Sequence, residues 1–210
     1  MILWFTYPPK QHLRHKKEHT MVFNISLIDN AVDELNSIRC DLELYNDIAN
    51  SDDIPINEQY FAIKRIIKQI DCAWELFMKY RLQLFDISLL FEKKQNTTFE
   101  QLQTGNFHTI YKKEAIRRLK ENGITASFTN LEKIAQYRNK IEHYQVEASL
   151  EEVLRAVFKA IDELSDFYEK QISIVCHNAQ SIDRGNEMLA EVHRAKDQLS
   201  NMIDEALFTD

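Results

Sequence analysis

Residues 63–85 decide the fold class, and they read IKRIIKQIDCAWELFMKYRLQLF. Apolar side chains recur there at spacings of three and four, through Ile63, Trp74 and Phe77, which is the pattern of one α-helix face. The stripe meets no Gly or Pro before about Lys94, so we expect one helix to continue that far. At 1.5 Å per residue it would be about 50 Å long, which makes it the expected spine of a bundle.

Similar stripes predict further helices before and after this segment. The first runs from about Ile25 to the polar residues 50–53, ahead of Pro55. A short helix is expected after a capping signal at residues 96–100, and a third main helix follows Asn106 and ends at residues 122–123. Two more helices begin with capping boxes, namely Thr129 with Glu132 and Ser149 with Glu152.

The chain divides into three parts on this reading. Residues 1–20 carry no helical stripe and are expected to form a loose tail, or to precede a true translation start at Met21. Residues 21–170 form the bundle. Residues 171–210 form a helical C-terminal arm with a weaker stripe, which could pack on the bundle, pair with a partner helix, or do both.

Composition supports an all-α fold, an up-down bundle of four to five helices with a helical C-terminal extension. The sequence of 210 residues contains only 3 Gly and 3 Pro, which argues against a Rossmann fold or a β-sandwich. The formal net charge of −7 means that a nucleic acid would have to be bound by a local basic patch.

Cysteine usage and hydropathy indicate the cytoplasm. The three cysteines are far apart and form no Cys-x-x-Cys pair, so we expect neither disulfides nor a zinc site. No apolar run approaches the roughly 18 residues that span a bilayer, and residues 1–7 lack the charge order of a secretory signal. No Gly-rich phosphate loop is present either, and we expect no cofactor and no metal.

The predicted helix after Thr129 ends in the most informative run of the sequence, residues 137–144, which read YRNKIEHY. Asn139 and His143 are four residues apart and share a helix face, while Arg138 lies on the flank beside Asn139. An imidazole can exchange protons near neutral pH, and a guanidinium can hold a phosphate and stabilise developing negative charge. These groups suit phosphodiester cleavage in RNA without a metal.

In these residues the sequence resembles the HEPN superfamily, helical bundles marked by an Arg, usually a following polar residue, and a His four to six residues after the Arg. The resemblance covers about residues 24–170. It implies a metal-independent endoribonuclease of a toxin or antiphage system, with Arg138, Asn139 and His143 as catalytic residues. It also implies RNA as substrate, a homodimer with one composite cleft, and an antitoxin or other regulatory protein as partner.

The charge around the motif favours the same partner. Residues 106–146 hold eight Lys and Arg against four Glu, a local charge of +4 in an otherwise acidic chain. Local cations supply most of the affinity for phosphates. The candidate RNA-binding residues are Lys112, Lys113, Arg117, Arg118 and Lys140.

Other readings of the same residues stay open. Arg138 can pair with Glu142 one turn later, and His143 can be an ordinary histidine at a helix end. The basic residues can form a solvated helix face. The whole chain can then be a catalytically inactive module that binds RNA, a nucleotide or a protein, or a structural protein that oligomerises through its arm.

Overall fold

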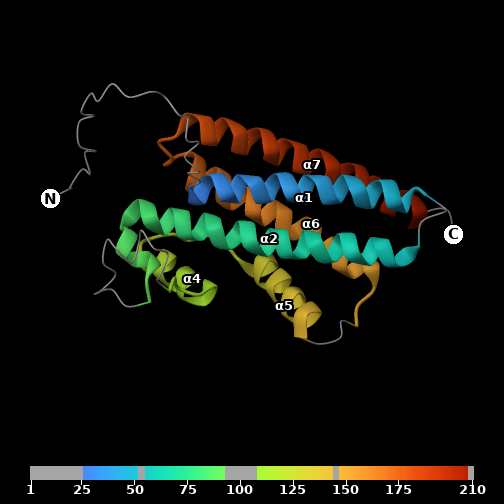
Figure 1. The fold of residues 1–210 in the computed structure, drawn as a ribbon, viewed down its shortest axis with the longest axis horizontal. Coiled ribbons are helices and arrows are strands. Elements are labelled where there is room, and N and C mark those ends of the chain that lie inside the picture. The colour runs from blue at the N-terminus through green and yellow to red at the C-terminus, as the bar shows by residue number, and fades with distance from the viewer. Residues whose placement is uncertain (1–25, 52–54, 93–107, 144–146, 208–210) are drawn as a thin grey trace, which may run out of the picture.

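The computed structural model of the protein describes residues 26–51, 55–92, 108–143 and 147–207. Six α-helices lie in these ranges, and their only strand-like pairing is an isolated bridge between Phe91 and Thr109. The predicted all-α bundle is therefore confirmed (Figure 1). The tail expected over residues 1–20 and the capping signals at residues 96–106 lie outside the described residues.

The first two helices form an antiparallel pair. Helix α1 (Leu27–Ala49) begins with a capping box, in which the Ser26 Oγ accepts a hydrogen bond from the backbone N–H of Asp29 at 3.2 Å. It ends close to its predicted boundary. Helix α2 (Ile56–Phe85) returns along α1, and the apolar stripes of the two helices are buried against each other.

The last two helices form a second antiparallel pair. Helix α6 (Leu150–Phe167) continues through a π-helical turn, η2 (Tyr168–Ser173), and helix α7 (Ala179–Leu207) then runs back beside α1. Leu189, Val192 and Leu199 of α7 are buried in the common core. Packing on the bundle is therefore one role of the C-terminal arm.

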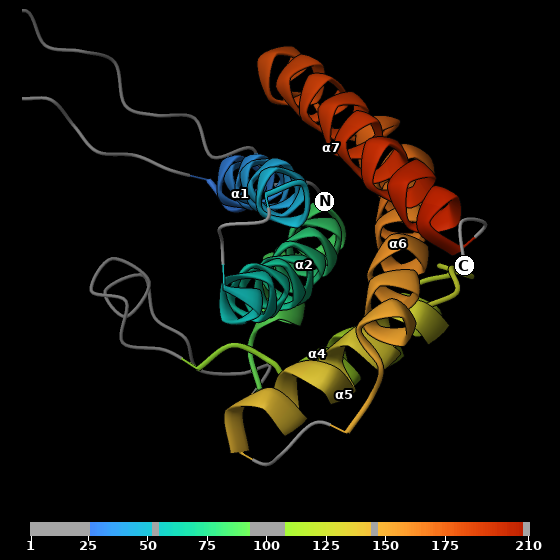
Figure 2. The same ribbon diagram turned by 90° about the vertical axis from the view of Figure 1, so that its right-hand side faces the viewer.

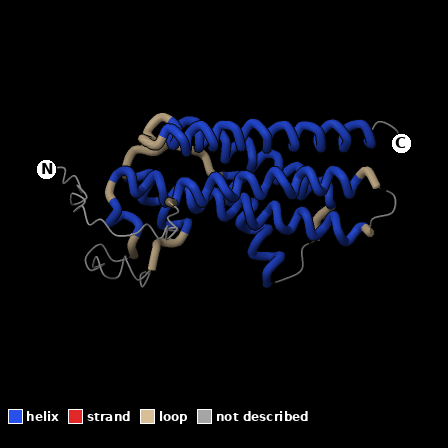
Figure 3. Tube along the Cα trace, turned by 45° about the horizontal axis from the view of Figure 1, so that its top comes forward, coloured by secondary structure: helices blue, strands red, loops and turns tan. Residues whose placement is uncertain are grey.

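Two short helices connect the pairs. Helix α4 (Lys112–Glu121) and helix α5 (Thr129–His143) carry the chain back along the outside of α2, so that α2 and α6 run in the same direction (Figures 1 and 2). The helices within each pair are therefore antiparallel, and the segment with α4 and α5 is the crossover that joins the two pairs. The view in Figure 3 shows α5 leaving the bundle at a steep angle to the long helices.

The predicted extension of α2 to Lys94 is wrong. The helix ends at Phe85 because Asp86 adopts an extended conformation, with φ −163° and ψ 126°. The Asp86 carboxylate accepts a hydrogen bond from the Ser88 backbone N–H at 2.8 Å and so caps a 3₁₀ turn, η1 (Ile87–Leu90). The apolar stripe continues beyond Phe85, but its residues belong to this turn.

The predicted third main helix begins later than Asn106, because α4 begins at Lys112. Its predicted end is confirmed. The backbone N–H of Ile124 donates to the Leu119 carbonyl at 3.0 Å, and Gly123 takes the left-handed φ of +83°. This is a Schellman motif, in which Gly avoids the strain that a side chain would meet at positive φ.

Gly185 allows α7 to approach Tyr168 of the π-helical turn closely. A Cβ atom added at Gly185 would lie 2.7 Å from Cζ of Tyr168, and closer still to its hydroxyl oxygen. The Tyr168 side chain is fully buried, and its hydroxyl donates to the Ile182 carbonyl at 3.1 Å. The missing side chain of Gly185 therefore makes room for a large core residue.

Candidate functional site

The site predicted from the sequence lies on α5, and α6 fixes where that helix begins. The backbone N–H groups of Asn130 and Leu131 each donate to one carboxylate oxygen of Glu163 at 2.8 Å. The predicted Thr129–Glu132 capping box is wrong, because Thr129 is already helical and the backbone N–H of Glu132 bonds to the Phe128 carbonyl. A carboxylate from α6 caps α5 instead.

We expect the Glu163→Ala variant to lose about 1–2 kcal/mol of stability, because two helix N–H groups lose their acceptor. Chemical denaturation followed by circular dichroism measures the loss. The Glu151→Ala variant is the matched control, since Glu151 forms an ion pair with Arg155 on the surface of α6. An equal effect of the two substitutions would contradict the tertiary cap.

Helix α5 presents one apolar and one polar face. Leu131, Ile134 and Tyr137 are buried against the bundle, and the Tyr137 hydroxyl donates to the Glu152 carboxylate at 3.0 Å. Asn139 and His143 are exposed on the side turned away from the bundle. The end of the helix that carries them projects from α2 (Figure 1).

Arg138 lies between these two faces. Its side chain is 40% exposed, and its Nη1 donates to the Asn139 Oδ1 at 3.3 Å. The Nη2 lies 3.0 Å from a Glu142 carboxylate oxygen, and the Nε lies 3.8 Å from Asp71 of α2. The alternative pairing of Arg138 with Glu142 is therefore present, and the guanidinium is held in place while part of it faces solvent.

Glu142 connects the cations around the motif. Its second carboxylate oxygen lies 3.1 Å from the Lys68 Nζ of α2. This hydrogen bond first, and then the charges of Arg138, Lys68 and His143, hold the pKa of Glu142 below its ordinary value. The ionised Glu142 is thus the group that an incoming phosphate would replace at Arg138.

Asp71 anchors the inner side of this network. Its side chain is 6% exposed, and one oxygen forms ion pairs with Arg138 and with Lys112 of α4. The other oxygen is buried and has no hydrogen-bond partner among the described residues. Lys112 also lies 3.7 Å from Glu75. The burial of a carboxylate is costly unless nearby cations compensate it, so the ion pairs of Asp71 tie α4 and α5 to α2. The sequence pattern did not reveal this residue, which is far from the motif along the chain.

The predicted RNA-binding cations fall into different classes. Lys113 and Lys140 are exposed, and Lys112 is engaged with carboxylates of α2. Arg117 pairs with Glu114 on the surface of α4. Among the five predicted RNA-binding residues, only Lys113 and Lys140 carry a positive charge that is not paired with any described carboxylate.

Arg118 is a correction to the sequence prediction. The residue is 5% exposed, and its Nη1 donates to the backbone carbonyls of Leu89 and Phe91 at 2.9 Å each. Its Nε donates to the Glu114 carboxylate at 2.6 Å. Arg118 therefore fastens α4 to the segment after α2, and we remove it from the candidate RNA-binding set.

The Glu114 carboxylate gives this junction a pH dependence. Hydrogen bonds from Arg117 and Arg118 lower the pKa of Glu114 from an ordinary 4.5 to about 2. A lowered pKa stabilises the folded state above pH 4.5, and this contribution is lost as the pH falls from 4.5 toward 2. We expect Glu114→Gln to cost about 1 kcal/mol at neutral pH, a modest value because the site is near the surface.

Urea denaturation of wild type and Glu114→Gln between pH 7 and pH 3 measures this difference. It should shrink steadily below pH 4.5. The Glu121→Gln variant serves as a control, because Arg117 is the one partner of Glu121 among the described residues and Glu121 is more exposed than Glu114. A stability difference that does not change with pH would contradict the role of the Glu114 charge.

Ser165, His193 and Asp162 have the residue types of a hydrolase triad. The Ser165 Oγ lies 2.8 Å from the His193 Nε2, and the His193 Nδ1 lies 3.7 Å from Asp162. The same hydroxyl also donates to the Ile161 carbonyl at 2.9 Å and is on a buried residue. A nucleophile needs a substrate beside it, so we assign this group to the packing of α6 on α7.

Neither a metal site nor a membrane span occurs among the described residues. No three His, Cys, Asp or Glu side chains lie close enough together there to hold a metal ion. None of the helices in the described ranges is long and apolar enough to cross a membrane.

Comparison with known proteins identifies the family. Residues 43–204 match the family described as Domain of unknown function (DUF3644), a match that runs from α1 through most of α7 and includes all of α5. No curated protein and no solved structure matches the chain. The protein therefore belongs to the DUF3644 family.

Proposed function

We propose that the exposed end of α5 cleaves RNA, as an endoribonuclease of HEPN type that needs no metal ion. The observation that carries this proposal is the Arg138 guanidinium, which is anchored by Asp71 and Glu142, bonded to Asn139, and still partly open to solvent. His143 is exposed at the end of the same helix. A positioned cation beside an accessible imidazole is the minimum that such a reaction requires.

The chemistry assigns one role to each residue. His143 takes the proton from a ribose 2′-hydroxyl, the 2′-oxygen bonds to the adjacent phosphorus, and the bond from phosphorus to the 5′-oxygen breaks. The 5′-oxygen receives a proton, so the products are a 2′,3′-cyclic phosphate and a 5′-hydroxyl. Arg138 holds the phosphate and stabilises its added charge, and Asn139 orients the guanidinium.

In the resting site the Glu142 carboxylate pairs with Arg138. An RNA phosphate must replace its carboxylate at Arg138, and Lys68 then remains as the partner of Glu142. Replacing the Glu142 carboxylate at Arg138 by an RNA phosphate costs less free energy than binding that phosphate to a surface with carboxylates and no available cation. The pairing seen in the structure is thus compatible with a phosphate site.

A second copy of the chain completes the proposal. One imidazole cannot accept the 2′-proton and donate to the 5′-oxygen at the same moment, whereas a homodimer that faces two α5 ends provides two. We also propose that the enzyme acts in the cytoplasm as a toxin or antiphage component, under the control of an antitoxin or similar protein.

The experiment is an RNA cleavage assay in excess EDTA with the purified chain. We expect cleavage of single-stranded RNA, 2′,3′-cyclic phosphate ends, and no cleavage of the same strand made with 2′-deoxyribose. Light scattering of the same sample measures whether the protein is a dimer. Cleavage of the deoxy strand, or dependence on an added metal, would refute the mechanism.

The second candidate is an inactive module that binds RNA, a nucleotide or a protein. The pairing of Arg138 with two carboxylates is the observation that favours it, because this is also what a purely structural arginine would do. A wild-type chain that binds RNA in a gel-shift assay but leaves it uncut in every buffer would establish this alternative.

A further inference from the structure

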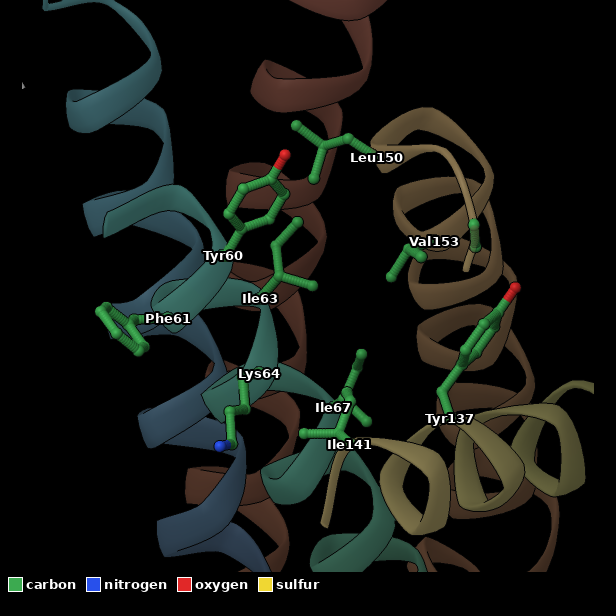
Figure 4. Close-up of a pocket in the computed structure, with 10 residues that line it drawn as sticks. Tyr60, Phe61, Ile63, Lys64, Ile67, Tyr137, Ile141, Leu150 and Val153 are labelled. Carbon is green, nitrogen blue, oxygen red and sulfur yellow. The ribbon is translucent and has the colours of Figure 1, made fainter. Parts of the chain in front are cut away.

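An open pocket lies beside the proposed site, on the other flank of α5. It has a volume of about 240 Å³ and is bounded by the start of α2, the end of α5 and the start of α6 (Figure 4). Ile63, Ile67, Ile141 and Val153 form its apolar wall. Tyr60 and Tyr137 stand on opposite sides of the opening.

The rim of this pocket is aromatic and unusually exposed. Tyr60 is 52% exposed and Phe61 is 53% exposed, although large aromatic side chains usually bury most of their surface. Lys64 is the only charged residue among the described residues that line the pocket, in a chain with a net charge of −7. The pocket therefore suits a flat, mostly apolar ligand.

The pocket and the proposed catalytic residues share two turns of one helix. Tyr137 precedes Arg138, and Ile141 lies two residues before His143. At 1.5 Å per residue, Ile141 and Arg138 are about 4.5 Å apart along the helix axis. The pocket and Arg138 therefore lie on the same two turns of α5, on its two flanks.

We infer that this pocket binds one base of single-stranded RNA, next to the phosphate that is cleaved. The inference rests on the proposed function for its choice of ligand. Pockets for drug-sized ligands have volumes of about 300–1,000 Å³, so this smaller one fits a single ring system. Stacking of a base on an aromatic side chain contributes about 5- to 100-fold in affinity. The base subsite thus makes RNA a substrate only where its bases are unpaired.

The test measures binding rather than cleavage, with the full chain carrying His143→Ala so that the RNA stays intact. Fluorescence anisotropy compares a short single-stranded RNA with a strand of equal length that has the same phosphates but no bases. We expect the RNA to bind about 5- to 100-fold more tightly than the abasic strand. Adding Tyr60→Ala should remove most of this difference, and Tyr60→Phe should keep it, because only the ring stacks.

Two further variants separate the subsite from general effects. Ala148→Trp fills the pocket and leaves the Tyr60 side chain unchanged, and it should also abolish the preference for bases. Phe85→Ala removes another exposed aromatic residue, at the far end of α2, and should leave the preference unchanged. Circular dichroism confirms that each variant is folded.

The possible results separate this inference from the proposed function. Equal binding of RNA and abasic strand, equal losses on both strands in Tyr60→Ala, or no RNA binding at all would overturn the base subsite. Binding of an apolar peptide or fatty acid in place of RNA, blocked by Ala148→Trp, would overturn it as well. A chain that never cleaves RNA but shows the Tyr60-dependent base preference would refute the nuclease and retain the subsite.

Discussion

Replacing His143 with alanine is expected to lower the rate of RNA cleavage by about 10²- to 10⁴-fold, the usual contribution of a general acid or base. The side chain is exposed at the end of α5, so its loss should not affect folding. Free imidazole in the buffer should restore part of the rate to His143→Ala, because it can enter the vacated position and carry the proton. Initial rates at saturating RNA measure both effects.

Matched variants make this result specific. Arg138→Ala should lose about 10²- to 10³-fold and should not respond to imidazole, since it lacks charge stabilisation rather than a proton carrier. His177→Ala and Arg155→Ala remove an exposed histidine and an exposed arginine elsewhere and should keep full activity. Full activity in His143→Ala would exclude the proposed catalytic residue, whatever else cleaves the RNA.

Replacing Gly185 with alanine is expected to destabilise the protein by about 2–3 kcal/mol. Gly to Ala in the interior of a helix normally stabilises by about 1 kcal/mol, so the expected sign is opposite to the helix propensity. The reason is Tyr168, whose ring and hydroxyl occupy the space that the new methyl group needs. Because Tyr168 is buried on all sides, the ring cannot move aside at low cost.

A double variant tests the cause of this loss. Tyr168→Phe removes the oxygen atom nearest to the added methyl group, so Gly185→Ala should cost clearly less in that background. Thermal and urea denaturation of the four proteins give the coupling energy. Equal costs in both backgrounds, or a more stable Gly185→Ala protein, would show that α7 does not pack on Tyr168 as described.

The helices could be predicted from the sequence wherever a boundary depends on neighbouring residues. The cap at Ser149 and the Schellman end of α4 at Gly123 are both set by local chemistry. The end of α2 and the group that caps α5 were mispredicted, because Asp86 caps the next turn and Glu163 reaches α5 from another helix. An apolar stripe shows which side is buried, but it does not show where the backbone stops being helical.

The candidate site was predictable in its residue types and not in its partners. The sequence placed Arg138, Asn139 and His143 on one helix, and the pairing of Arg138 with Glu142 follows from their spacing. Asp71 belongs to a helix far away in sequence, and only the fold brings it to Arg138. The local charge count wrongly placed Arg118 among the RNA-binding residues for the same reason. The sequence shows that the residue is charged, but only the fold shows that its guanidinium is buried.

The position of α1 between α2 and α7 has a consequence for the growing chain on the ribosome. Asp29 of α1 accepts a hydrogen bond from Ser181 of α7 at 2.9 Å, and the two residues are separated by nearly all of the described sequence. At about 5–20 residues per second, translation needs on the order of 10 s to proceed from α1 to α7. During that time the side of α1 that packs on α7 has no cover. The complete core of the bundle is therefore not expected to form before α7 has been made.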